Sequence, residues 1–282
     1  MDRITLPQDL TIAVCCSALQ DSGVSANVAG AVLRAHELGF GGVELSAHHV
    51  LSERGSLREI VDLIQSSGLR LVGLHNAVPR SVVAFDEKGA IQPTYRTALK
   101  ETFTIAVELC APLITVGIGS SRRLPRDMPP ATATLTLLDL FSTTAHSTGY
   151  PGTISFEIIS SKTAGFGNTA KEVQPLLDAL EMPRVGLTCD TYQSFRQGVD
   201  PVEEIEHAGR HLVHLHVAEL DRRPPGTAGL RTDLISDALR RVAFCGAVSV
   251  EPSPRPDDSD QLIVELKNSV RHLRSCLDKR VR

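Results

Sequence analysis

Short apolar runs alternate along the chain with stretches whose apolar residues recur at helical spacing. Each run is short and mostly apolar, which is typical of parallel strands that are covered on both faces. The eight expected strands are residues 11–16, 42–45, 70–75, 113–118, 153–158, 185–190, 212–217 and 247–251. Between them, apolar residues at positions i, i+3, i+4 and i+7 predict eight amphipathic helices, as in the set Leu57, Ile60, Val61 and Ile64.

This alternation predicts an α/β fold, a (β/α)8 TIM barrel in a single domain over residues 1–282, with the barrel itself at about 11–277. The 282 residues divide into units of roughly 35, the size of one βα repeat in such barrels. The competing architecture is a doubly wound open sheet, but no GxGxxG motif follows the first expected strand. No Gly/Ser-rich linker or low-complexity segment divides the chain.

Composition and charge narrow the classes of partner. The chain has 29 Lys and Arg against 33 Asp and Glu, a net charge of −4, and only 4% aromatic residues with no Trp. This balance argues against a nucleic-acid partner, which needs basic surface and aromatic stacking. No apolar run approaches the roughly 20 residues of a membrane helix, and residues 1–10 lack the apolar core of a signal peptide. The six Cys form no CxxC pair, so we expect reduced thiols in a cytoplasmic protein without a membrane partner.

Charged or imidazole side chains occur at the ends of six of the eight expected strands, where the active sites of TIM barrels lie. These residues are Glu44, His75, Glu157, Asp190, His216 and Glu251. For any one of them, exposure to solvent at the rim of the barrel is an equally good explanation.

Four of these residues, Glu157, Asp190, His216 and Glu251, come from consecutive expected strands. Adjacent strands lie about 4.8 Å apart, so four neighbouring strand ends can converge on one ion. Three carboxylates and a neutral imidazole form an oxygen-rich ligand set, which suits Mn²⁺, Mg²⁺ or Co²⁺ better than a thiolate-type zinc site does. The sequence therefore predicts one divalent metal ion at this end of the barrel. His214, one layer deeper than His216, is interpreted as a core histidine.

The segments around these residues resemble a known family. They are Ser155-Phe156-Glu157, residues 185–192 around Asp190, residues 214–226 around His216, and residues 248–251. Through them the chain, from about residue 11 to 254, resembles the xylose isomerase-like TIM barrels, the sugar phosphate isomerase/epimerase superfamily. Its members include ketose 3-epimerases of the D-tagatose type, whose spacing is closest, hydroxypyruvate isomerases, inosose dehydratases and barrel-type AP endonucleases.

The resemblance implies that Glu157, Asp190, His216 and Glu251 bind one divalent metal ion, with Mn²⁺ expected first and Mg²⁺, Co²⁺ or Zn²⁺ as alternatives. It also implies that the metal acts as a Lewis acid on a carbonyl and a neighbouring hydroxyl of a sugar and stabilises an enediolate. Glu157 and Glu251 are then the catalytic pair, one removing a proton next to the carbonyl and the other returning it.

Three further residues are expected to bind substrate by the same resemblance. Arg222, in the loop after His216, would donate a hydrogen bond to a substrate oxygen, and His75 stands where many members have a third-strand histidine. Gln193 stands just after Asp190, where many epimerases and the endonucleases have a histidine. An amide can hydrogen-bond a substrate, but it is a poor metal ligand.

We therefore expect an enzyme, a divalent-metal-dependent isomerase or epimerase of a sugar or related polyhydroxylated carbonyl compound. The alternative is a metal-dependent dehydratase or lyase of a keto-inositol or similar substrate, because it begins with the same proton removal. An AP endonuclease-like phosphodiesterase would need several more histidines, and a barrel that only binds a sugar or a partner would not need the intact acid set. The expected partner is a small-molecule sugar or cyclitol. A homo-oligomer is compatible with a family that often pairs through its helices.

Two loops at the expected carboxyl end of the barrel are also informative. One departs from the sequence pattern of the ketose 3-epimerases, and the other is rich in arginine. Residues 158–165 contain no acid, whereas the epimerases place one a turn past the residue that matches Glu157, so we expect a different substrate pocket from that of a free-ketose 3-epimerase. Arg122, Arg123 and Arg126 follow the fourth expected strand and are expected in a solvated loop.

Overall fold

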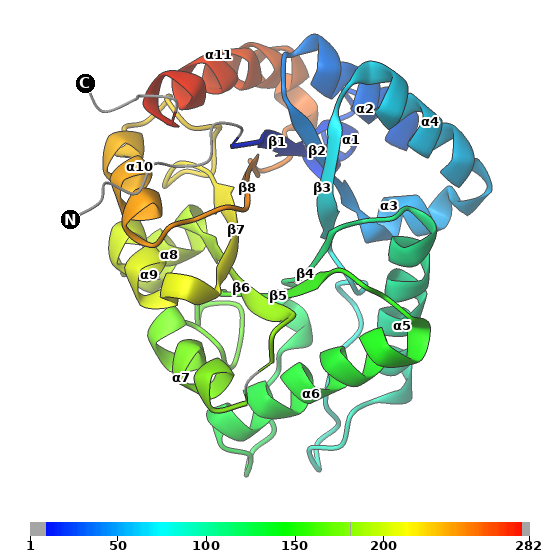
Figure 1. The fold of residues 1–282 in the computed structure, drawn as a ribbon, viewed down its shortest axis with the longest axis vertical. Helices are drawn as coiled ribbons and strands as arrows, with labels where there is room; N and C mark the ends of the chain where they lie inside the picture. The colour runs from blue at the N-terminus through cyan, green and yellow to red at the C-terminus, as the bar shows by residue number, and fades with distance from the viewer. Residues whose placement is uncertain (1–9, 181, 278–282) are drawn as a thin grey trace.

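The chain folds into a closed barrel of eight parallel strands, in which β8 pairs with β1 (Figure 1). The computed structural model describes residues 10–180 and 182–277. The strands are β1 (Ile12–Cys15), β2 (Gly42–Ser46), β3 (Arg70–His75), β4 (Leu113–Val116), β5 (Thr153–Glu157), β6 (Val185–Asp190), β7 (Leu212–Val217) and β8 (Ala247–Val250). Each strand pairs in parallel with the next one in the sequence, which confirms the expected (β/α)8 barrel.

Several strands are one or two residues shorter than expected. β5 stops at Glu157 and β8 at Val250, so Glu251 is the first residue after its strand. Hydrogen bonding nevertheless continues past the ladder, because Ile158 N donates to the Thr188 carbonyl and Glu251 N to that of Val217. The difference is therefore one of strand definition at frayed ends, and both carboxylates still stand at the carboxyl end of the barrel.

Helices surround the barrel on the outside (Figure 1). The α-helices of the described residues are α1 (Cys16–Asp21), α2 (Val28–Glu37), α3 (Ala47–Ser52), α4 (Leu57–Ser67), α5 (Pro93–Glu108), α6 (Pro130–Thr148), α7 (Ala170–Leu180), α8 (Thr191–Gln197), α9 (Pro201–Ala208), α10 (Thr232–Arg241) and α11 (Ser259–Leu277). The expected strict alternation of eight strands and eight helices is wrong, because β1, β2 and β6 are each followed by two α-helices. The first of each pair (α1, α3 and α8) has only six or seven residues, too few for apolar spacing to reveal.

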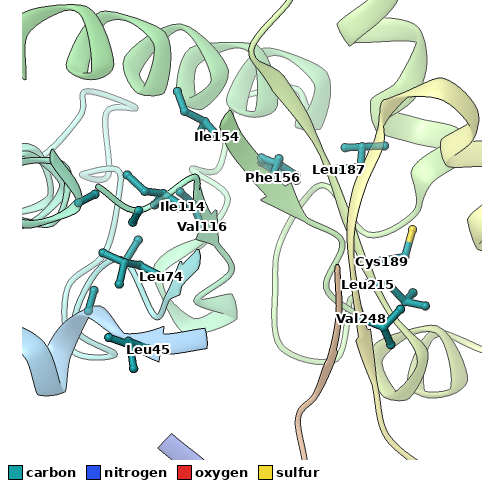
Figure 2. Close-up of a cluster of buried hydrophobic side chains, with 14 of the residues drawn as sticks. Leu45, Leu74, Ile114, Val116, Ile154, Phe156, Leu187, Cys189, Leu215 and Val248 are labelled. Atoms are coloured by element: carbon teal, nitrogen blue, oxygen red, sulfur yellow. The ribbon is translucent and has the colours of Figure 1, made fainter. Parts of the chain in front are cut away.

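The apolar core lies between the outer face of the barrel and the helices. Buried side chains that alternate along the strands, such as Ile154 and Phe156 of β5 and Leu187 and Cys189 of β6, form this layer (Figure 2). Since successive residues of a strand point to opposite faces, the residues between them point into the barrel. Burial of the apolar positions therefore fixes which polar side chains face inward.

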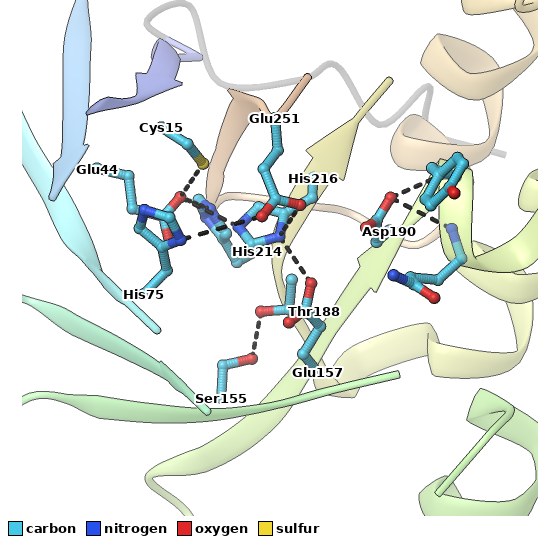
Figure 3. A network of polar contacts seen from close by, with 12 residues as sticks. Cys15, Glu44, His75, Ser155, Glu157, Thr188, Asp190, His214, His216 and Glu251 are labelled. Atoms are coloured by element: carbon cyan, nitrogen blue, oxygen red, sulfur yellow. Dashed lines mark hydrogen bonds and ion pairs between the residues drawn. The ribbon is translucent and has the colours of Figure 1, made fainter. Parts of the chain in front are cut away.

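The inside of the barrel is lined by small and polar residues below its carboxyl end. Ser155 of β5 and Thr188 of β6 are buried, and their hydroxyl oxygens lie 2.5 Å apart in a hydrogen bond (Figure 3). Glu157, Asp190 and His216 stand one layer above them on the same face.

Among the helices of the described residues, none has both the length and the apolar character needed to cross a membrane.

Candidate metal centre

Four side chains meet at the carboxyl end of the barrel. Glu157 and Asp190 are the last residues of β5 and β6, His216 lies in β7 opposite Asp190, and Glu251 follows β8. Each offers one ligand atom, and the four atoms all lie within 4.8 Å of one another (Figure 3). The structure thus brings together the four side chains that the spacing of the strands singled out.

The donor set fits a hard divalent cation. Asp190 Oδ1 accepts hydrogen bonds from the backbone N–H groups of Tyr192 and Gln193, at 2.8 and 3.4 Å, at the start of α8. The other carboxylate oxygen, Oδ2, is buried and has no hydrogen-bond partner among the described residues. A buried oxygen without a partner is costly, and a cation is the partner that this carboxylate-rich group would accept most readily.

Burial, together with nearby like charges, raises the pKa values of the two acids at the ends of β5 and β6. Burial raises the pKa of Asp190 to about 7, and the nearby Glu251 carboxylate adds to the effect. Burial also raises the pKa of Glu157, although His216 opposes the shift. Both groups therefore hold protons more tightly than ordinary acids do, as expected for buried carboxyl groups that lie close to one another.

The pKa of Glu251 is shifted in the opposite direction, below its usual value. Burial acts to raise its pKa, but the Arg222 guanidinium and His216 outweigh burial and lower it. Arg222 Nη2 donates to Glu251 Oε2 at 3.0 Å, and the guanidinium carbon lies 4.8 Å from the centre of the Tyr192 ring. The site therefore holds one carboxylate biased toward the ionised form beside two that are biased toward the protonated form.

His216 is held from both sides of its ring. Its Nδ1 lies 2.9 Å from Glu157 Oε1, and its Nε2 lies 3.1 Å from Glu44 Oε2. Glu44 Oε2 also lies 2.9 Å from Nε2 of His214, the residue interpreted as a core histidine. Glu44 is fully buried inside β2 rather than at its mouth, so sequence reasoning placed this acid in the right strand but missed its partners.

Two other groups of candidate ligands overlap the first, since one shares His216 with it and the other shares Glu251. Both contain Cys15, in one case with Glu44 and His216 and in the other with His75 and Glu251. Burial raises the pKa of the Cys15 thiol well above its usual range, and the thiol donates to Glu44 Oε2. A protonated thiol is a poor ligand, so the carboxylate-rich group is the better candidate for a hard cation.

The residues expected to bind substrate fall in different surroundings. His75 ends β3, with Nε2 3.3 Å from Ser17 Oγ and Nδ1 4.0 Å from Glu251 Oε1. Gln193 lies in α8, where its side-chain oxygen accepts from Ser160 N at 3.3 Å, in the loop after β5. Arg222 and His75 thus lie against Glu251, whereas Gln193 braces a neighbouring loop.

Arg122 is a supporting residue that sequence reasoning missed. It was expected in solvent, but it is 1% exposed, whereas Arg123 and Arg126 are exposed as expected. Its guanidinium donates to the carbonyl oxygens of Glu157 and Val116, both at 2.7 Å, and lies 3.9 Å from the centre of the Phe156 ring. The signal available in the sequence was its place in the loop that follows β4.

Gly117 gives the Glu157 carboxylate its space. A Cβ atom at this position would lie 1.4 Å from Glu157 Oε2, closer than any real contact. Gly117 follows β4 directly, so the neighbouring strand leaves a gap into which the carboxylate fits.

Glu219 orders the loop that carries Arg222. Its carboxylate is 1% exposed and accepts from the backbone N–H groups of Gly226, Thr227 and Leu230, at 2.7, 3.1 and 2.7 Å. The same loop holds Arg222 at a φ of 60°, a left-handed conformation that the surrounding hydrogen bonds must enforce.

Comparison with known proteins agrees with this architecture. A family model described as a xylose isomerase-like TIM barrel matches residues 32–276. The chain is 28% identical over 99 residues to a D-psicose 3-epimerase of Enterocloster bolteae, and 26% identical over 98 residues to a ketose 3-epimerase of Arthrobacter globiformis. These stretches cover 35% of this chain in both cases, and 33% and 34% of the relatives, so the matched part is about a third of each relative's length.

Two solved structures share the fold over nearly the whole chain. A D-psicose 3-epimerase crystallised in the presence of D-fructose has a TM-score of 0.80 at 19% identity, covering 96% of this chain and 100% of that one. A 3-keto-D-glucoside 4-epimerase from E. coli has a TM-score of 0.76 at 19% identity, covering 95% and 100%. At this identity the likeness establishes the fold.

Proposed function

The chain belongs to the xylose isomerase-like TIM barrel family, and from this premise we propose that it is a divalent-metal-dependent isomerase or epimerase of a sugar or related polyhydroxylated carbonyl compound. The observation that carries the proposal is the convergence of Glu157, Asp190, His216 and Glu251 within 4.8 Å. Their oxygen-rich donor set, in which Glu157, Asp190 and His216 are buried and Glu251 is partly buried, suits a hard cation such as Mn²⁺, with Mg²⁺, Co²⁺ and Zn²⁺ as alternatives.

The names of the similar proteins point to one type of reaction, epimerisation, on several different sugars. One set acts at carbon 3 of a ketose, and another protein acts at carbon 4 of a 3-keto-glucoside. In both, the carbon named is adjacent to a carbonyl, where a C–H proton is acidic enough to be removed. We therefore define the substrate class as a small sugar or cyclitol that carries a carbonyl next to the carbon that reacts.

In the proposed mechanism, Glu157, Asp190, His216 and Glu251 hold the metal. When bound, the divalent cation supplies a Lewis acid that draws electrons from the substrate carbonyl and offsets the negative charge that develops next to it. Asp190 is oriented for this task by the two N–H groups at the start of α8, and His216 by the carboxylates on either side of its ring.

Glu157 and Glu251 are the proposed acid–base pair. The pKa of Glu251 is lowered by Arg222 and His216 against the effect of burial, whereas burial raises the pKa of Glu157. Two carboxyl groups whose environments push their pKa values apart are suited to opposite roles, so we assign proton removal to Glu251 and proton return to Glu157 in one direction of the reaction. The roles exchange in the reverse direction.

Arg222, His75 and Gln193 are the proposed substrate-binding residues. Arg222 and His75 lie beside Glu251, where a substrate proton would be removed. The buried Nε of Arg222 has no hydrogen-bond partner among the described residues, so the guanidinium retains a donor for a substrate oxygen. Gln193 acts from α8, where its side-chain oxygen accepts a hydrogen bond from Ser160 N of the loop after β5.

The proposal is tested by solvent exchange. The protein is stripped with a chelator, reloaded with Mn²⁺ and incubated in D₂O with a panel of ketoses, 3-keto-glycosides and keto-inositols, and deuterium next to the carbonyl is followed by NMR. We expect metal-dependent incorporation with at least one substrate, and its loss in Glu157→Gln and Glu251→Gln.

Glu101→Gln, which changes an exposed glutamate of α5, is the matched control and should exchange like the wild type. Exchange that survives metal removal, or no exchange with any substrate on the panel, would count against the proposal. Product analysis in the same samples separates epimerisation and isomerisation from loss of water.

A further inference from the structure

We infer that Glu44, buried beneath the metal centre, is a positioning residue that keeps His216 protonated at Nε2 so that Nδ1 is the nitrogen presented to the metal. The inference rests on the proposed metal centre and assigns a role to an acid outside it. Glu44 stands in the middle of β2, across the inside of the barrel from β7 (Figure 3).

One oxygen of Glu44 is the focus of three contacts. Glu44 Oε2 lies 2.9 Å from His214 Nε2, 3.1 Å from His216 Nε2 and 3.6 Å from Cys15 Sγ. Glu44 and Cys15 are fully buried, and the two histidines are each 1% exposed. A charged acid can remain in such a place only if donors surround it, so the three neighbours must direct hydrogens at it.

These contacts decide the protonation of the His216 ring. An ionised carboxylate can only accept, so the nitrogen that faces Glu44 carries a hydrogen. The opposite nitrogen, Nδ1, lies 2.9 Å from Glu157 Oε1 and 3.6 Å from Glu251 Oε2, among the proposed ligands. Nδ1 would then offer its lone pair to a metal held there, while the hydrogen on Nε2 would stay directed at Glu44.

Glu44 also explains why His214 is a histidine. Its Nε2 donates to the same carboxylate oxygen from one layer below, and its ring is nearly perpendicular to that of His216, at 88° and 5.0 Å between centroids. Two donors from β7 thus converge on one acceptor of β2 and hold the His216 ring at a fixed angle. Loss of the acceptor charge would free the ring and make its nitrogen a weaker ligand.

The first experiment measures Mn²⁺ affinity by EPR titration of wild type, Glu44→Gln and Cys15→Ser. Glu44→Gln keeps the shape and removes the charge, and we expect it to bind Mn²⁺ about 10- to 100-fold more weakly. Cys15→Ser changes the thiol that donates to Glu44 and keeps a hydrogen-bond donor at that position, so the variant should bind Mn²⁺ within about twofold of the wild type.

Equal affinity in Glu44→Gln and wild type would overturn the inference, even if the variant melts at a lower temperature. A loss in Cys15→Ser as large as in Glu44→Gln would also overturn it, because the group of Cys15, Glu44 and His216 would then be binding the metal directly. Wild-type protein that fails to bind Mn²⁺ would remove the metal centre itself. Binding that is normal in wild type and in Glu44→Gln removes only the role of Glu44.

A second measurement needs no variant at Glu44 and so does not depend on that variant's folding. Long-range ¹H–¹⁵N spectra of the Zn²⁺-loaded wild type, labelled at histidine and assigned with the help of His216→Gln, report which ring nitrogen carries hydrogen. We expect the hydrogen of His216 on Nε2 and the metal shift on Nδ1. Hydrogen on Nδ1 and metal on Nε2 would contradict the inference.

Discussion

The substitution Gly117→Ala is a test of the candidate site that alters none of its ligands. A Cβ at position 117 would lie 1.4 Å from Glu157 Oε2 and 2.6 Å from its Cδ, whereas real contacts do not fall below 3.0 Å. The carboxylate oxygen must therefore move by about 1.6 Å, and a displacement of about 1 Å in a catalytic group typically costs about 100-fold in rate. Gly117 does not have a positive φ, so alanine adopts its backbone conformation without strain.

We expect Gly117→Ala to reduce the rate of deuterium incorporation by about 100-fold or more and to weaken Mn²⁺ binding, because Glu157 is both a proposed ligand and a proposed acid. Overpacking of this kind costs about 1–3 kcal/mol of stability, a fraction of the total for a typical protein, so the variant should remain folded. The change is measured by solvent exchange, EPR titration and thermal unfolding in the same preparations.

The control is Gly55→Ala, at a glycine that lacks a positive φ and has no atom within 4 Å of a built Cβ. It should leave exchange and Mn²⁺ affinity unchanged. If Gly117→Ala behaves like this control, Glu157 does not occupy the position on which the proposed centre depends, and the reasoning fails.

Three further predictions follow from individual contacts. Burial raises the pKa of Asp190 to about 7, and a carboxyl group must lose its proton to bind a metal, so Mn²⁺ affinity should fall as the pH drops below about 7 and level off above it. A Mn²⁺ affinity that stays constant from pH 5.5 to 8.5 would contradict the assignment of Asp190 as a ligand. Arg122→Met should lower the free energy of unfolding in urea by about 2–5 kcal/mol, because the buried carbonyls of Glu157 and Val116 each lose a donor; an unchanged midpoint would show that water replaces the guanidinium. Glu219→Gln should speed amide hydrogen exchange in residues 219–230 and raise KM more than it lowers kcat, because the loop loses a charged acceptor of three N–H groups; unchanged loop exchange would refute the role of this acid.

The barrel was predictable because its pattern is local and repeated. Strands such as β3, β6 and β7 appear in the sequence as short apolar runs, and their observed bounds match the expected ones. The short helices α1, α3 and α8 could not be found in this way, because one or two turns are held by what they pack against and leave no periodic pattern. They matter to the site, since the start of α8 orients Asp190 through the N–H groups of Tyr192 and Gln193.

The proposed ligands were predictable for a different reason. Glu157, Asp190 and His216 occupy alternate positions of strands whose other positions are apolar, so their inward direction follows from the pleat. The link between Glu44 and His214 joins residues 170 positions apart, and it depends on which layers of β2 and β7 coincide when the barrel closes. The spacing of residues along the chain does not show how far the strands of a barrel are shifted relative to one another. The available signal was chemical, since a buried acid in one strand needs a buried donor in another.

The residues that stabilise the barrel and the residues of the candidate site lie on opposite faces of the same strands. On β5, Phe156 packs outward into the core while Ser155 and Glu157 face inward, and on β7 Leu215 packs outward while His214 and His216 face inward. The outward face of each of these strands therefore buries the apolar side chains that stabilise the fold, and the inward face can carry charged groups that pair across the barrel. A slip of one residue in either strand would exchange the two faces and lose both, so the apolar core that selects the register also places the four proposed ligands.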